Sequence, residues 1–153
     1  MSRLELKVPP DVVWVLVAGL MWLASATTPH VDIPSQFRVG TAVALTVVGV
    51  CAMVSARASL DRAHTTWRPM APGRATSLVT SGVYGLSRNP IYLGMLFVLL
   101  GWAVLLASPA ALASSGVFVL YLNRFQIGPE ERALTATMGQ EFLDYRVHVR
   151  RWL

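Results

Sequence analysis

The sequence has few charged residues for its length. Of its 153 residues, 14% are Asp, Glu, Lys or Arg, whereas 54% are hydrophobic. Soluble domains carry about 25% charged residues on average. A deficit of this size argues against an ordinary soluble domain and favours an integral membrane protein.

Lysine and cysteine are almost absent. Lys7 is the only lysine, so arginine supplies nearly all of the positive charge behind the net charge of +5. Cys51 is the only cysteine, which excludes a disulfide within the chain. A basic chain indicates either nucleic acid or an anionic membrane surface as its partner. The long apolar runs favour the membrane lipid, and we expect no nucleic-acid partner.

Several motifs of common enzyme classes are also missing. The sequence has no Walker-type Gly-rich loop with lysine, no CxxC, no HExxH and no Gly-x-Ser-x-Gly. Its histidines, His30, His64 and His148, lack the spacing of metal ligands. We therefore expect no metal site.

Four apolar stretches predict membrane-spanning helices. A span needs about 20 mostly apolar residues, within a range of roughly 17–25. With their flanks, the stretches give spans of approximately 11–28, 38–57, 90–107 and 109–125. Ser108-Pro109 predicts a tight hairpin between the last two, because proline suits the first turn of a helix. The first stretch is also compatible with a cleavable signal peptide, since Arg3 and Lys7 precede it and Ala24-Ser25-Ala26 near its end resembles a cleavage site.

The positive charges predict the orientation in the membrane. With the N-terminus inside, all 13 lysines and arginines except Arg38 fall in cytoplasmic segments. This bias follows the positive-inside rule. We expect a bacterial-type inner-membrane protein with both termini and the loop 58–89 on the cytoplasmic side.

The C-terminal segment predicts an amphipathic helix over 129–147. Pro129 and the acids beside it are typical of a helix N-terminus. Leu134, Met138 and Phe142 then recur every four residues as one apolar stripe. The predicted fold is all-α, a single domain over 1–153 with about four transmembrane helices and this cytoplasmic helix.

The strongest chemical signals are two polar clusters on the cytoplasmic side. The first, 78–94, places an arginine, an asparagine, two tyrosines and three glycines around a helix start at Pro90. Snorkelling or lipid phosphate binding would explain an arginine alone, but not this density. The second cluster, 124–131, ends in Glu130-Glu131, where helix capping and a functional role are both open.

Together, these clusters resemble the integral membrane methyltransferases that include isoprenylcysteine carboxyl methyltransferase and phospholipid N-methyltransferase. The pattern comprises Leu-Val-x-x-Gly-x-Tyr, Arg-His/Asn-Pro-x-Tyr-x-Gly, a hairpin, Glu-Glu-x-x-Leu and a tail with Tyr and Arg-Trp. This chain carries these pieces at 78–84, 88–94, 130–134 and 145–152. Each piece is weak alone, but their order and spacing from about His64 to the C-terminus are specific.

The resemblance implies S-adenosylmethionine as the methyl donor, bound at the cytoplasmic face. It implies a cofactor site formed by Thr76, Ser77, Leu78, Val79, Tyr84, Asn89, Pro90, Ile91, Tyr92 and Glu130. Arg88 is suited to pair with the cofactor carboxylate, and Arg88 and Tyr92 are the candidate catalytic residues. No general base is evident.

Two positions depart from the carboxyl methyltransferases. Asn89 stands where those enzymes have His, and Gln126 stands where the prenylcysteine enzymes have an Arg that faces the substrate carboxylate. A neutral amide is a weaker carboxylate partner than arginine, which argues against a prenylcysteine acceptor. Gln126 and the nearby Arg124 are the candidate substrate-binding residues.

The sequence therefore predicts a membrane methyltransferase with a lipophilic or amphipathic acceptor. Phospholipid amine N-methylation and small-thiol S-methylation are alternatives within the same class. An NADPH-dependent protein of the sterol-reductase type and a membrane scaffold are the alternatives outside it.

Overall fold

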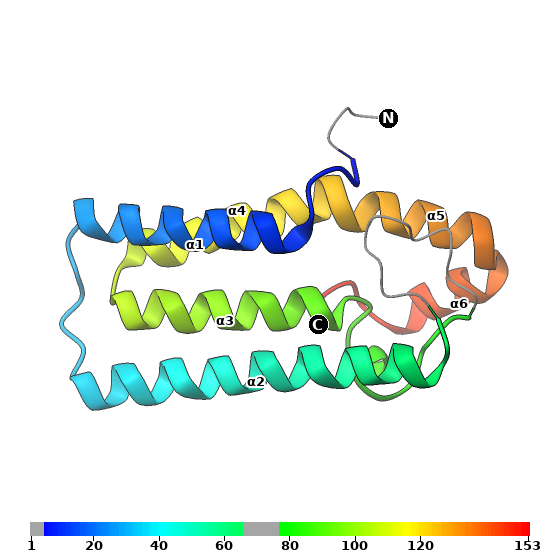
Figure 1. The fold of residues 1–153 in the computed structure, drawn as a ribbon, viewed down its shortest axis with the longest axis horizontal. Coiled ribbons are helices and arrows are strands. Elements are labelled where there is room, and N and C mark those ends of the chain that lie inside the picture. The colour runs from blue at the N-terminus through cyan, green and yellow to red at the C-terminus, as the bar shows by residue number, and fades with distance from the viewer. Residues whose placement is uncertain (1–4, 66–76) are drawn as a thin grey trace.

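The computed structural model describes residues 5–65 and 77–153, and within these ranges it contains helices and no strands. Figure 1 shows the helices of residues 10–27, 35–62, 90–106 and 109–121 side by side, with those of residues 128–138 and 140–148 beyond one end of the bundle. In chain order the elements are α1 (Pro10–Thr27), α2 (Ser35–Arg62), the 3₁₀ turn η2 (Gly82–Gly85), α3 (Pro90–Leu106), α4 (Pro109–Tyr121), the π-helical turn η3 (Leu122–Ile127), α5 (Gly128–Met138) and α6 (Gln140–His148).

Prolines mark the starts of the helices. Pro10, Pro90 and Pro109 each occupy the first position of a helix, where the missing N–H has no intrahelical partner to lose. The predicted hairpin between α3 and α4 is confirmed. Ala107 closes α3 with a left-handed backbone conformation, and the Ser108 hydroxyl accepts a 3.2 Å hydrogen bond from the Ala111 N–H.

Glycines allow α2 and α3 to pack backbone against backbone. A Cβ atom built on Gly49 would lie 2.5 Å from the Gly94 carbonyl oxygen, and one on Gly94 would lie 2.5 Å from the Gly49 oxygen. Farther along, a Cβ on Gly101 would meet the Ala42 oxygen at 2.9 Å. Small residues at such contacts are typical of helix pairs in membranes.

The core lies between α1, α3 and α4. Its fully buried members include Met21 and Phe118. Two indoles join α1 to α3 through backbone carbonyls: Trp14 Nε1 donates to Met95 at 3.0 Å, and Trp102 Nε1 donates to Ala18 at 3.2 Å. These bonds satisfy the polar edge of each tryptophan inside an apolar interface.

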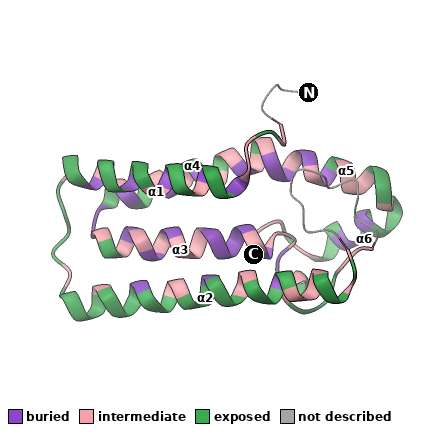
Figure 2. Cartoon of the chain, in the orientation of Figure 1, coloured by how far each residue is buried: buried purple, intermediate pink, exposed green. Residues whose placement is uncertain are grey.

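The outer faces of the bundle are apolar and exposed. Figure 2 shows α2 exposed along most of its length, and Leu16 and Val54 are more than 60% exposed. By length and composition α1 and α2 can cross a membrane, whereas α3 has 17 residues and α4 has 13. An apolar outer surface of this kind suits a hydrocarbon solvent. Two of the four expected spans, α1 and α2, are therefore long and apolar enough to cross a membrane.

Three predicted boundaries need correction. α2 continues to Arg62, so the first residues of the expected loop 58–89 are helical. The expected single helix over 129–147 is two helices, because Gly139 has φ +58° and ψ −127° and leaves helical geometry. The helical path also continues from α4 into α5 without a break, through the π turn η3.

Candidate functional site

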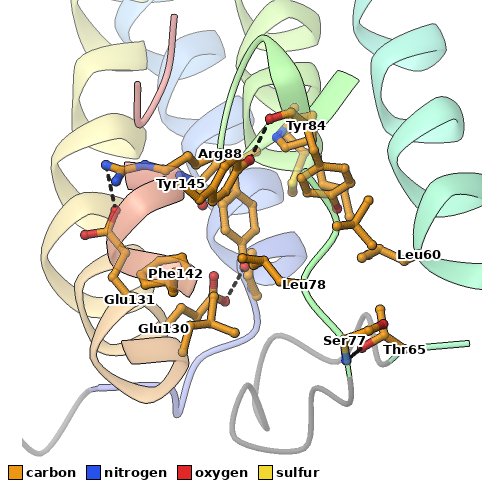
Figure 3. Close-up of a pocket in the computed structure, with 18 of the residues that line it drawn as sticks. Leu60, Thr65, Ser77, Leu78, Tyr84, Arg88, Glu130, Glu131, Phe142 and Tyr145 are labelled. Carbon is orange, nitrogen blue, oxygen red and sulfur yellow. Dashed lines mark hydrogen bonds and ion pairs between the residues drawn. The ribbon is translucent and has the colours of Figure 1, made fainter. Parts of the chain in front are cut away.

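A cavity of about 400 Å³ lies where α5 and α6 approach the starts of α1 and α3. Ligand pockets are typically about 300–1,000 Å³. Figure 3 shows side chains from both polar clusters around it. The lining consists of Pro10, Asp11, Leu60, Thr65, Ser77, Leu78, Val79, Tyr84, Arg88, Asn89, Pro90, Ile91, Tyr92, Met95, Glu130, Glu131, Leu134, Phe142 and Tyr145.

The cavity brings together most of the residues selected from the sequence. Ser77, Leu78, Val79, Tyr84, Arg88, Asn89, Pro90, Ile91, Tyr92 and Glu130 all line it. Thr76 lies outside the described residues. Gln126 is 1% exposed and contacts the lining through its hydrogen bond to Glu130. Arg124 is not part of the lining, because its side chain is 62% exposed and pairs with Glu5.

Glu130 is held by donors from two helices. The Tyr92 hydroxyl of α3 donates a 2.6 Å hydrogen bond to Glu130 Oε1, and the Gln126 amide donates to the same oxygen. Burial raises the pKa of Glu130 to about 7, although both hydrogen bonds favour the ionised form and lower it. The cavity thus contains a carboxyl group that titrates near neutral pH.

Glu131 forms a second charged centre beside Glu130. Its carboxylate pairs with Arg88 Nη2 at 3.1 Å and with Arg151 Nη2 at 2.6 Å. The Arg88 side chain is only 11% exposed, and burial lowers the pKa of its guanidinium. Among the described residues, the buried Arg88 Nε has no hydrogen-bond partner. Buried charges are stable only when paired, so Glu131 holds Arg88 at the cavity wall.

The C-terminal segment is hydrogen-bonded to the residues just before α3. The Arg88 N–H donates to the Arg150 carbonyl at 3.0 Å, and Asn89 Nδ2 donates to the Arg151 carbonyl at 2.9 Å. Trp152 Nε1 donates to Asn123 Oδ1 at 3.1 Å. The Asn89 amide is therefore occupied by backbone, although the residue also lines the cavity.

Two aromatic residues of α6 complete the cavity, and they were not among the predicted site residues. The Tyr145 hydroxyl donates a 2.6 Å hydrogen bond to the Tyr84 carbonyl oxygen. Burial raises the pKa of the Tyr84 phenol and raises that of Tyr145 to about 12, so both are neutral at physiological pH. Phe142 belongs to the apolar stripe predicted from the sequence, and this periodicity could have indicated that Phe142 is buried near the site.

No group of three or more His, Cys, Asp or Glu side chains that could hold a metal ion occurs within 5–65 and 77–153. The described lining combines an apolar wall with three carboxyl groups, those of Asp11, Glu130 and Glu131, and the Arg88 guanidinium.

The described residues form an all-helical bundle with exposed apolar helices and a cavity at one end, which is the architecture of a small membrane protein. A sequence model of the family described as phospholipid methyltransferase matches residues 37–141, more than half of the chain. The chain belongs to the phospholipid methyltransferase family. The family membership expected from the two motif clusters is confirmed.

Two relatives match parts of the chain. An uncharacterized protein of Haemophilus influenzae is 40% identical over 63 residues, which are 41% of this chain and 100% of that protein. Human protein-S-isoprenylcysteine O-methyltransferase is 36% identical over 73 residues, which are 48% of this chain and 26% of the human protein. The chain thus matches about a quarter of the length of the human relative. No solved structure matches the chain.

Proposed function

We propose that the chain is an S-adenosylmethionine-dependent membrane methyltransferase whose cofactor binds in the cavity. The observation that carries this proposal is that lining residues from 77–92 and from 130–145, two segments on either side of a helical hairpin, meet in one cavity. Perturbed titratable groups in a pocket are typical of functional sites.

The residues present suit this cofactor. Glu130 is suited to its cationic amino group or its ribose hydroxyls, and the apolar wall of Leu78, Val79 and Ile91 suits the adenine ring. Arg88 is suited to its carboxylate, since the Nε–H of Arg88 is buried and unpaired within the described part of the chain. When bound, the cofactor supplies an electrophilic methyl group on a sulfonium.

The protein's contribution is positioning and exclusion of water. Tyr92 and Arg88 are the candidate catalytic residues, because both line the cavity. Tyr92 orients the Glu130 carboxylate through its hydroxyl, whereas Arg88 is fixed by Glu131. A carboxylate or thiolate acceptor needs no base at these residues.

The acceptor is proposed to be lipophilic or amphipathic. The bundle presents apolar helices outward, so a lipid-borne acceptor would approach from the side. A prenylcysteine carboxylate is disfavoured, because the Gln126 amide is bound to Glu130 and Arg124 lies away from the cavity.

An amine acceptor, such as a phospholipid amine, is the second candidate. An amine must lose a proton before or during methylation, and a carboxyl group with a pKa of about 7 is suited to accept one. Glu130 is such a group and lies in the cavity.

We propose four spans with both termini in the cytoplasm of a bacterial-type inner membrane. In the described residues Arg38 lies near the start of α2, whereas Arg57, Arg62, Arg88 and the arginines after residue 120 belong to the end of the bundle that holds the cavity. This segregation fits the positive-inside rule.

Methyl transfer itself tests the proposal. The purified protein in lipid nanodiscs would receive radiolabelled S-adenosylmethionine with a total lipid extract, a small-thiol mixture or an amine mixture. Label in one fraction, lost in Glu130→Ala but kept in the exposed control Glu141→Ala, is expected. A thermal shift with NADPH and none with S-adenosylhomocysteine would support the reductase alternative. A thermal shift with neither compound, together with no methyl transfer, would support the membrane-scaffold alternative.

A further inference from the structure

The N-terminal segment contacts the helix that carries Gln126 and Glu130. The Glu5 side chain is 5% exposed, and its two oxygens lie 3.4 Å from Arg124 Nη1 and 2.8 Å from Arg132 Nη2. Both arginine side chains are more than half exposed. One buried carboxylate therefore joins two arginines of the η3–α5 segment.

The two arginines bracket the residues of the site. Arg124 lies two positions before Gln126, and Arg132 lies two positions after Glu130. Residues two positions apart lie on nearly opposite faces of a helix. Glu5 therefore contacts the face of these turns that points away from the cavity, whereas Gln126 and Glu130 lie on the face toward it.

The backbone of this segment is held as well. In an α-helix the Phe125 carbonyl would accept from the N–H of residue 129, but Pro129 has no N–H. The Phe125 oxygen accepts a 3.1 Å hydrogen bond from the Leu6 N–H instead. The N-terminal segment thus satisfies a carbonyl in the π turn, next to the two ion pairs.

The π turn is a rare geometry that occurs mostly as a single turn inside α-helices. The Gly128 N–H donates to the Asn123 carbonyl, five residues back, and a Cβ on Gly128 would lie 3.2 Å from that oxygen. Glu5 also compensates the like charges of Arg124 and Arg132, since it pairs with both. π turns occur frequently at functional sites.

We propose that Glu5 is a positioning residue that holds the η3–α5 joint, and through it the Gln126–Glu130 pair, in the geometry that binds cofactor. This inference rests on the proposed function for its effect on binding, but not for its effect on the joint. The segment also leads directly into Pro10 and Asp11, which line the cavity.

The test compares full-length Glu5→Gln with wild type, with the exposed Glu141→Gln as the matched control. Hydrogen–deuterium exchange of the segment 122–131 is measured without ligand, and S-adenosylhomocysteine affinity is measured by calorimetry well below the unfolding temperature. Glu5→Gln is expected to speed exchange in this segment and weaken binding by about tenfold. The charge-swapped double variant Glu5→Arg/Arg132→Glu is expected to recover part of both effects, and the control to change neither.

A purely structural role predicts a different pattern. If Glu5→Gln lowers the unfolding temperature while exchange of 122–131 and the affinity stay at wild-type values, the proposal is overturned. Where a variant unfolds, Glu5→Asp gives the same two readouts with the charge retained and is expected to lie between wild type and Glu5→Gln. If wild type itself binds no S-adenosylhomocysteine, the proposed function fails, and the exchange result alone decides the role of Glu5.

Discussion

The Tyr92 hydroxyl donates a 2.6 Å hydrogen bond to the Glu130 carboxylate across 38 positions of sequence. Both residues line the cavity, so this bond joins α3 to α5 there. It links the first motif cluster to the second, so a change in either cluster is expected to alter the charge and position of one carboxyl group.

Removing that hydroxyl should shift the pH dependence of cofactor binding. The bond favours ionised Glu130, so Tyr92→Phe is expected to raise the pKa of Glu130 further above about 7. If ionised Glu130 holds the cofactor, affinity for S-adenosylhomocysteine at pH 7 falls about threefold to tenfold and recovers toward pH 9. Calorimetry from pH 6 to pH 9 measures this. A uniform loss of affinity at every pH would contradict the explanation.

The ionised form of Glu130 should also lower the stability of the folded protein as the pH rises. Its pKa rises from the ordinary glutamate value of 4.5 to about 7 in the folded protein, so the folded state binds the proton more tightly. The stability that this provides is present below about pH 4.5 and is lost as the pH rises through about 7. At pH 8 the free energy of unfolding of Glu130→Gln should therefore exceed that of wild type by roughly 1–3 kcal/mol. The variant should accordingly unfold at a higher temperature.

The comparison of Glu130→Gln with wild type at pH 4.5 and pH 8 provides the control. The difference in unfolding temperature should be larger at pH 8, because only there is the wild-type carboxylate ionised in the folded protein. A variant that is less stable than wild type at pH 8 would contradict the assignment of a costly buried charge.

Breaking the Glu131 centre should destabilise the protein strongly. Glu131→Gln leaves Arg88 and Arg151 without their carboxylate, and uncompensated buried charge costs about 3 kcal/mol. Asp61→Asn is the matched control, because its pair with Arg57 is more than half exposed and should contribute less than about 1 kcal/mol. Unfolding in detergent measures both. Equal losses of unfolding free energy in Glu131→Gln and Asp61→Asn would contradict the claim that the buried ion pairs of Glu131 contribute more than the exposed pair of Asp61.

The close approach of α2 and α3 predicts a size limit at Gly94. Gly94→Ala would place a Cβ 2.5 Å from the Gly49 oxygen, and relief of this clash by separation of the helices should cost about 1–3 kcal/mol. Gly40→Ala meets no atom within 4 Å and should be neutral or stabilising, since alanine favours helix. The two unfolding temperatures should move in opposite directions. A stabilising Gly94→Ala would contradict the packing.

The sequence predicts the helices and much of the site for clear physical reasons. Apolar runs bounded by Pro10, Pro90 and Pro109 define helices because proline fixes their first turns. The two clusters reveal the lining because unusual polar residues beside apolar runs are costly without a role. In both cases the signal is local in sequence.

The features missed by the sequence depend on long-range contacts or on special backbone geometry. No periodicity indicates the π turn, because its i to i−5 bond is a small departure from an α-helix. The roles of Glu5 and Arg151 arise from partners 119 and 20 positions away. Gly139 indicates a possible break, but its positive φ is evident only from the structure.

Calorimetric titration of the purified protein with S-adenosylhomocysteine tests the central claim most directly. Wild type should bind with one site per chain, Glu130→Ala should show no measurable binding while keeping its helical circular dichroism, and exposed Glu141→Ala should bind as wild type does. Binding by Glu130→Ala with wild-type affinity, or no binding by folded wild type, would contradict the assignment of this cavity to the methyl donor.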